Sequence, residues 1–325
     1  MALPLTEAEA WFVGHGLPYF VDGIRDDVRA HLGRARLFVV AVIALAVGAT
    51  AGIGVGLWSG HASFGISIGA TAVLAILALY AVRALKTWMM VTWALRRTFR
   101  SLGLLFPLAT RALPLLLLFI TFLFINAEVW QVASSLDGGV LWLTVLLFAG
   151  VAIGFLLVRL DEELDQFDDD IDGAQLIDAC RRTPLEDTAR RLVAEGADLN
   201  ADAEVHGLQK ANLVLVLLIS QAVQVLLLSI AVFAFFILFG VVAIDDAVIE
   251  SWIGKEPIYA GDVRLVSQEL TQVSIFLAAF SGLYFTVYAV TDATYRKQFF
   301  TAISRELERA VSARVAYREQ RRRAA

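Results

Sequence analysis

The chain has one cysteine, Cys180, so no disulfide can form within it. It is also poor in charge, because 18% of its 325 residues are Asp, Glu, Lys or Arg, whereas a soluble domain has about 25%. A hydrophobic fraction of 58% is too high for a disordered chain. The composition therefore excludes a disulfide-stapled scaffold, an ordinary soluble enzyme and a disordered protein.

Sequence signatures of catalysis and cofactor binding are missing as well. The four histidines have no metal-binding spacing, and no Gly-x-x-x-x-Gly-Lys-[Ser/Thr] loop is present. The alternating glycines at 52–56 lie inside an apolar run, where they indicate helix packing. No nucleophile and base are clustered. We therefore expect no enzymatic activity, no resident cofactor and no nucleic-acid partner.

Long uncharged runs hold most of the apolar residues, and the mean hydropathy is +0.70. A membrane-spanning helix needs about 20 such residues. Six windows qualify: 37–58, 62–82, 112–133, 140–158, 213–244 and 270–293. The sequence thus predicts an all-α polytopic membrane helix bundle with six transmembrane helices. The fifth window is too long for one crossing, so its helix must tilt or project beyond the bilayer.

Positive charge is distributed very unevenly between the connecting segments. Of the 27 Lys and Arg residues, all but Lys255 and Arg264 fall before the first window, after the second, after the fourth or after the sixth. The positive-inside rule then predicts a bacterial plasma-membrane protein with both termini on the cytosolic side. An even number of spans agrees with this orientation.

The expected organisation follows from these windows. It comprises a cytosolic or interfacial N-terminal segment (1–36), transmembrane helices one to four (37–158), a small acidic helical cytosolic insertion (159–212), transmembrane helices five and six (213–293), and a long basic cytosolic C-terminal helix (294–325).

Two segments beside the spans have two interpretations each, one of which involves contact with lipid. The aromatic residues Trp11, Phe12, Tyr19 and Phe20 fit either a helix and turn at the membrane interface or a packed cytosolic cap. Basic and aromatic residues are mixed in 83–111, which favours a topology determinant and also fits binding of anionic lipid at the inner face.

Two prolines precede the third window. Pro107 and Pro114 each lack a backbone donor, so they predict a bend or a break there.

The insertion contains part of a calcium-binding pattern. Asp168, Asp170, Asp172 and Gly173 match the first half of such a loop. Ala179 stands where the bidentate glutamate belongs, so a Ca²⁺ site is the weaker interpretation and a solvated acidic face the stronger.

Residues 173–201 resemble a single ankyrin repeat. One repeat cannot bury its own apolar face. We therefore expect a helical hairpin that docks on the inner membrane face or on another subunit.

Glycines recur every four residues in the first two windows. Gly48, Gly52 and Gly56 lie in the first, and Gly65 and Gly69 in the second. Small residues at this spacing let two helix backbones approach closely. The pattern favours tight packing of these two spans over a glycine-lined pore.

Polar residues near the outer end of the spans form the first candidate site. Asn126, Glu128 and Gln131 lie in the third window, and Asp245 and Asp246 follow the fifth. Carboxylates at one level can form a vestibule that attracts cations. The alternative is hydrated surface at the headgroup level.

A second set lies in the inner half of the bundle. Gln221 and Gln224 share a face of the fifth span, and Ser281, Tyr288 and Asp292 belong to a seam on the sixth, with steps of three and four residues. Unpaired polar groups are costly in lipid. The seam therefore faces a neighbouring helix or a water-filled pathway, or it lies on the axis of a homo-oligomer.

Four segments resemble a family of uncharacterised integral membrane proteins common in actinobacteria: 11–21, 111–131, 220–226 and 284–292. The resemblance extends over most of the chain and implies no activity. Two functions stay open. One is an oligomeric, cation-leaning ion channel or transport pathway. The other is a non-enzymatic membrane scaffold or signalling protein that acts through its insertion and tail.

Overall fold

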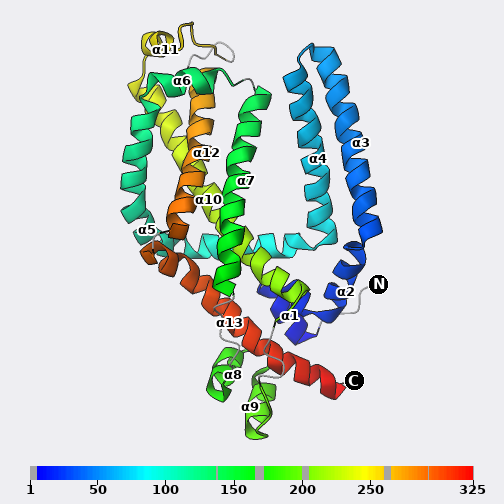
Figure 1. The fold of residues 1–325 in the computed structure, drawn as a ribbon. Helices are drawn as coiled ribbons and strands as arrows, with labels where there is room; N and C mark the ends of the chain where they lie inside the picture. Colours follow the sequence, from blue (N-terminus) through cyan, green and yellow to red (C-terminus); the bar gives the residue numbers. More distant parts are fainter. Residues whose placement is uncertain are drawn as a thin grey trace.

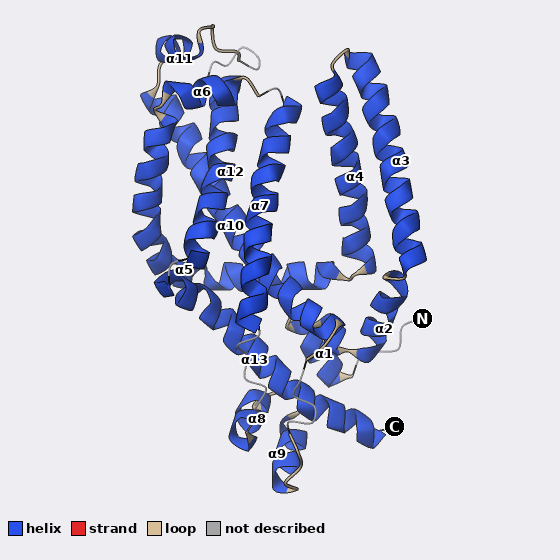
Figure 2. Cartoon of the chain, viewed as in Figure 1, coloured by secondary structure: helices blue, strands red, loops and turns tan. Residues whose placement is uncertain are grey.

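Apolar runs of this length must satisfy their backbone hydrogen bonds internally, which favours helices. The computed structural model describes residues 6–136, 138–164, 172–199, 205–259, 265–291 and 293–324; for 100–116, 138, 159, 161–164, 289–291, 293–307 and 324 it describes the backbone only. Within these ranges the chain forms helices α1–α13 and one 3-10 helix, η1, and no strand (Figures 1 and 2). The all-α helix bundle is therefore confirmed.

Five upright helices are long and apolar enough to cross a membrane. They are α3 (Arg34–Ser59), α4 (Ala62–Ala84), α7 (Gly138–Leu164), α10 (Leu208–Ala243) and α12 (Gln268–Thr291). Helix α12 packs against α7, α10, α6 and α5, and Figure 1 shows it inside the bundle. The helices correspond to the first, second, fourth, fifth and sixth expected spans, and they identify an integral membrane protein.

The third expected span is wrong as a straight helix over 112–133. Helix α5 (Thr87–Phe124) ends before it, and α6 (Ala127–Ser134) leaves at 74°. The Asn126 side chain caps α6 by accepting a hydrogen bond from the backbone N–H of Glu128 (2.8 Å). The indole Nε1 of Trp130 donates to the carbonyl of Phe124 (2.6 Å). These bonds satisfy backbone groups at both sides of the break. Counted together, the bent pair makes a sixth span.

Helix α5 also passes through both prolines without ending. Its backbone is helical across Pro107 and Pro114. Figure 1 shows its first part crossing the base of the bundle and its second part standing upright near α12. Of the two expected outcomes, a bend or a break, the chain bends.

A second group of helices lies below the upright ones and is here called the basal domain (Figure 1). It comprises α1 (Glu7–Gly14), η1 (Pro18–Phe20), α2 (Asp22–His31), α8 (Gly173–Cys180), α9 (Glu186–Ala194) and the later half of α13 (Ala293–Ala324). Three segments far apart in the sequence thus share one hydrophobic core, which also contains the first turns of α10.

The N-terminal aromatic residues belong to this core. Phe12, Tyr19 and Phe20 are at most 1% exposed. The Phe12 ring stacks on Phe20 and meets Tyr317 of α13 edge-on. These three rings therefore pack against protein, as in the packed-cap interpretation.

The α8–α9 hairpin docks within its own chain. Leu176, Leu185 and Leu192 are buried in the core together with Ala313 and Ala316 of α13. The expectation that the hairpin docks on the membrane or on another subunit is wrong. The apolar face of the hairpin packs against the C-terminal helix α13. In the sequence the two are separated by the membrane helices α10 and α12.

Candidate functional site

The outer candidate residues lie on a cap, defined as 126–134 with α6 and 245–253 with α11 (Asp246–Ile253). Glu128 is exposed in the first turn of α6. Asp245 is the residue before α11, and Asp246 accepts a hydrogen bond from the Tyr259 hydroxyl. Gln131 donates to the carbonyl of Trp252 (3.0 Å), which joins the two short helices.

These positions give the outer candidate residues roles that differ from those expected. Asn126 and Gln131 make structural hydrogen bonds, as helix cap and helix tie. Glu128, Asp245 and Asp246 are exposed on the cap. The prediction that Asn126, Glu128 and Gln131 lie within a straight span is therefore wrong. The cap has an acidic surface, but in the described part of the chain these side chains do not surround a passage.

The inner candidates occupy the packed interface of α10 and α12. A Cβ on Gly282 would lie 2.5 Å from Oγ of Ser229, so the two helices touch closely there. Ser281 is buried, and its hydroxyl donates to the carbonyl of Leu277 (2.6 Å). Tyr288 stacks on Tyr284. Asp292 lies outside the described residues.

The amides of the fifth span keep unused hydrogen-bonding capacity. Gln221 is fully buried, and among the described residues neither its amide nitrogen nor its amide oxygen has a hydrogen-bond partner. The same holds for the amide oxygen of Gln224 and the hydroxyl of Ser220. A buried, unpaired polar group costs roughly 1–3 kcal/mol. Such groups are therefore either structural defects of the bundle or places where water enters.

The heptad-like seam of α12 is covered by the chain's own helices. Ser267, Ser274, Ala278 and Ser281 are each less than 7% exposed. The sequence left three surroundings open for this seam: a neighbouring helix, a water-filled pathway or the axis of an oligomer. The described part of the seam packs against neighbouring helices of the same chain. It therefore gives no support to an oligomer axis along this helix.

The calcium hypothesis concerns three aspartates of the insertion. Asp168 and Asp170 lie outside the described residues. Asp172 caps α8: its side chain accepts from the backbone N–H of Gln175 (2.6 Å), and Gln175 accepts in return from the backbone N–H of Asp172 (3.1 Å). This capping box gives Asp172 a structural role. In the described part of the chain, no three His, Cys, Asp or Glu side chains are grouped as metal ligands.

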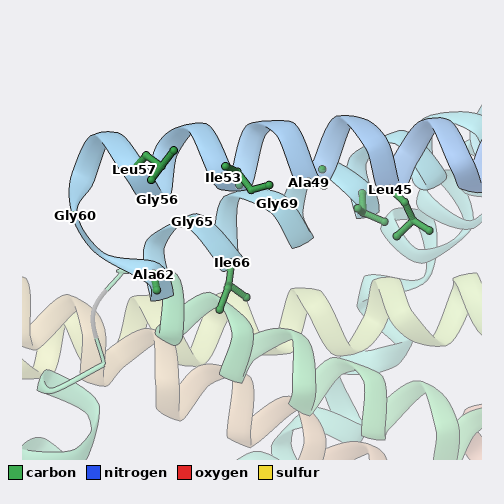
Figure 3. A pocket seen from close by; sticks show the side chains of 13 residues that line it. Leu45, Ala49, Ile53, Gly56, Leu57, Gly60, Ala62, Gly65, Ile66 and Gly69 are labelled. Carbon is green, nitrogen blue, oxygen red and sulfur yellow. The ribbon is translucent and has the colours of Figure 1, made fainter.

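The glycines of the first two spans face one another, as expected. A Cβ on Gly52 would lie 2.8 Å from the carbonyl oxygen of Gly65, and one on Gly48 the same distance from that of Gly69. Figure 3 shows Gly56, Gly65 and Gly69 along the line where α3 and α4 meet. An open groove of about 800 Å³ follows this line. The glycines therefore serve helix packing.

Asn212 joins the membrane bundle to the basal domain. It lies one turn inside α10 and is fully buried. Its Oδ1 accepts a hydrogen bond from the backbone N–H of Tyr19 (2.8 Å), and its Nδ2 donates to the carbonyl of Gly16 (3.0 Å). Both bonds are made by a turn that no water reaches, so their loss would be costly. The longest of the five candidate membrane-spanning helices is thus anchored in the N-terminal segment.

Arg309 joins the C-terminal helix to the insertion. Its Nε donates to the carbonyl of Ala179 and its Nη2 to that of Arg181, both at 2.7 Å. These carbonyls belong to the last turn of α8, where helical backbone acceptors lack partners. The guanidinium also lies over the Trp11 ring, 5.9 Å from its centre. One side chain thereby contacts all three segments of the basal domain.

A small charged network fastens the tail to the N-terminal helix. The Tyr317 hydroxyl donates to Glu9 (2.9 Å), and Arg321 lies 3.6 Å from Glu9 and 3.3 Å from Asp22. Burial raises the pKa of Glu9, but the hydrogen bonds from the Thr6 backbone and from Tyr317 outweigh this, so the pKa is lowered overall. Burial raises the pKa of Tyr317 to about 12. Glu9 is therefore held as a carboxylate and Tyr317 as a neutral donor.

Cys180 lies between the two carbonyls that Arg309 binds. It is fully buried in the core of the basal domain. Burial raises the pKa of its thiol to about 12. The thiol is therefore unreactive in the closed domain and reports whether that domain is open.

Asn212, Arg309 and Tyr317 were missed by the sequence reasoning. Asn212 carries a weak signal, since it is a polar residue at the start of an apolar run. Arg309 and Tyr317 carry none, because their partners lie 130 and 308 residues away. Comparison of the chain with protein-family models, with curated proteins and with solved structures gave no match.

Proposed function

We propose that this chain is a non-enzymatic membrane scaffold or signalling protein that works through the basal domain. The observation that carries the proposal is the pair of hydrogen bonds that Asn212 makes, accepting from the backbone N–H of Tyr19 and donating to the carbonyl of Gly16. They make the start of a membrane helix part of the basal core. A displacement of α10 must then disturb the N-terminal segment, because buried polar pairs do not tolerate separation.

The distribution of charge supports the placement of this domain. The helices of the basal domain carry 10 of the 27 Lys and Arg residues of the chain, and the cap carries none. By the positive-inside rule the basal domain and both termini lie on the cytosolic side of a bacterial plasma membrane. There the domain is available to cytosolic proteins.

A labelling experiment tests the link between bundle and basal domain. Gly282→Ala places a methyl group against Ser229 of α10, whereas a Cβ on Gly154 of α7 meets nothing within 4 Å. Full-length protein in liposomes is treated with a maleimide, and the rate at Cys180 is measured. We expect faster labelling for Gly282→Ala and an unchanged rate for the matched control Gly154→Ala. Equal rates in both variants would contradict the proposal.

A cation-leaning channel or transport pathway is the second candidate. It is favoured by the unpaired amide of Gln221 and the hydroxyl of Ser220, which would be satisfied by water in the inner half of the bundle. Exposed Glu128, Asp245 and Asp246 would then attract cations at the outer surface.

Ion flux into liposomes distinguishes the two functions. The scaffold proposal expects no flux above that of empty liposomes. If flux is present, Gln221→Leu should lower it, and Glu128→Gln should lower the cation-to-anion ratio. Flux that responds to both substitutions would replace the scaffold proposal by the channel.

Self-association is a separate proposal. The α12 seam is buried within the chain, so a homo-oligomer would form through another face. The open groove between α3 and α4 and the exposed apolar side chains beside it offer such a face. The mass of the protein in detergent, measured by light scattering, tests this directly.

A further inference from the structure

The first part of α5 crosses the base of the bundle, whereas α3, α4 and α7 stand upright (Figure 1). In a membrane protein this is the level at which upright helices meet the water. A helix that lies at this level can bury one face in protein and present the other to lipid headgroups. The residues of α5 divide in this way.

One face of this helix is fixed against the basal domain. Met90 and Ala94 are fully buried in the basal core, and Trp93 is 9% exposed. Gly16, at a positive φ of 79°, brings its backbone so close that a Cβ there would lie 3.0 Å from the Trp93 ring. These contacts set the rotation of α5 about its axis.

The corner before α5 fixes its direction. Lys86 adopts a left-handed conformation with φ of 54°, and its Nζ lies 3.0 Å from Asp27. The Tyr19 hydroxyl donates to the carbonyl of Leu85 (2.5 Å). The lysine charge stabilises the ionised carboxylate, so the pKa of Asp27 is lowered, mainly by the hydrogen bond from Lys86. The helix is therefore held at both its corner and its buried face.

The opposite face carries exposed aromatic and basic side chains. Trp88 is 61% and Phe99 55% exposed, and since eleven residues make about three turns they share one face. Arg96 lies at the edge of this face, and Arg83 lies in the last turn of α4, beside the corner. Both arginines are exposed, and neither has a hydrogen bond or ion pair with the described residues.

We propose that this face, defined by Arg83, Trp88, Arg96 and Phe99, binds the headgroups of anionic phospholipids in the adjoining leaflet. The guanidinium groups supply positive charge for the lipid phosphates, in a geometry suited to bidentate bonds. The indole and phenyl rings occupy the boundary between headgroups and acyl chains, which aromatic side chains prefer. The inference holds for a scaffold and for a channel alike, since it depends only on insertion in a membrane.

Native mass spectrometry of the full-length protein tests the proposal. Detergent-solubilised protein is titrated with phosphatidylglycerol or with phosphatidylcholine. We expect preferential retention of phosphatidylglycerol, which weakens as ionic strength rises because salt screens the charges. The double variant Arg83→Gln/Arg96→Gln should weaken this binding by roughly fivefold for each arginine. Equal retention of both lipids by the parent protein would overturn the proposal.

Two control variants make the result specific. Arg29→Gln/Arg190→Gln removes the same charge from two arginines that are each 62% exposed elsewhere in the basal domain, and it should leave lipid binding unchanged. Arg83→Lys/Arg96→Lys keeps the charge and should retain most of the preference. A loss of binding in the first control, or an unchanged preference in the glutamine double variant, would contradict the assignment to this face.

Discussion

The side-chain amide of Asn212 accepts a hydrogen bond from the backbone N–H of Tyr19 at 2.8 Å, across 193 residues of sequence. It connects the first turns of a membrane helix with a turn of the N-terminal segment. Because the site is fully buried, water cannot replace either partner. The coupling of bundle and basal domain rests on this bond and on the companion bond to Gly16.

Asn212→Ala should therefore destabilise the protein. Two buried backbone groups lose their partner, at roughly 1–3 kcal/mol each. We expect a lower Tm in detergent and faster proteolysis of the N-terminal segment. Asn126→Ala offers a comparison, since the Asn126 amide also binds backbone groups, but on the cap at the other end of the bundle. It should leave the N-terminal segment resistant, and cleavage there in both variants would argue against a specific role for Asn212.

Arg309→Gln should expose Cys180. The change removes the guanidinium that bonds the carbonyls on either side of this cysteine, so α8 loses two hydrogen bonds to the tail and keeps its apolar packing against it. In the parent protein the buried thiol, with its pKa raised to about 12, should react very slowly with a maleimide. We expect the labelling rate at pH 7.5 to rise at least tenfold in the variant. Arg322→Gln, in the same helix but bonded to Glu319, should behave as the parent.

The attachment of the tail should weaken in acid. The pKa of Glu9 is lowered in the folded protein, so its carboxylate stabilises the fold at every pH above the ordinary glutamate value of about 4.3. This contribution disappears as the pH falls through the lowered pKa. The Tm difference between the parent and Glu9→Gln should thus be largest near neutral pH and vanish in strong acid. A difference that does not change with pH would show that Glu9 acts by shape alone. Glutamine preserves the capping box with Thr6.

Two neighbouring glycines of α3 should respond to alanine in opposite directions. At Gly52 a methyl group would lie 2.8 Å from a carbonyl oxygen of α4, whereas at Gly54 it meets nothing within 4 Å. Gly52→Ala should destabilise the hairpin by about 1–3 kcal/mol through overpacking. Gly54→Ala should be neutral or stabilise the helix by up to about 1 kcal/mol. Thermal unfolding of both variants measures the difference, and equal losses would refute close contact of α3 and α4.

Most of the membrane architecture follows from the sequence, because a bilayer restricts the chain to long helices. The hydropathy windows located α3, α4, α7, α10 and α12. The length of α10 predicted that it tilts in the bilayer or projects beyond it, and its first turns, including Asn212, are buried in the basal domain.

The break at Asn126 was not predicted because the apolar run continues through it. Asn126 was interpreted as a pathway residue, although asparagine is also a strong helix cap. The bond from Trp130 to the Phe124 carbonyl depends on the bend itself, so no local pattern could indicate it. The sequence therefore placed Asn126, Glu128 and Gln131 in one straight span, whereas the structure places them at the break and on the short helix after it.

The basal domain was the largest unpredicted feature. Its segments were each expected to be helical, but their mutual packing depends on contacts between residues as far apart as Glu9 and Tyr317. Periodicity reports which face of a helix is apolar and not which partner covers it. The ankyrin-like hairpin is the clearest example, since its partner α13 was expected as a long basic C-terminal helix without any contact to the insertion.

Hydrogen exchange measured by mass spectrometry on the full-length protein tests the central claim most directly. The claim is that segments 7–31, 173–194 and 308–323 form one domain that is anchored on α10. A cooperative domain opens as a unit, with one opening free energy. We predict that the three segments share one level of protection and that Asn212→Ala lowers it in all three. Protection that differs between the segments, or a loss confined to 7–31, would contradict the account.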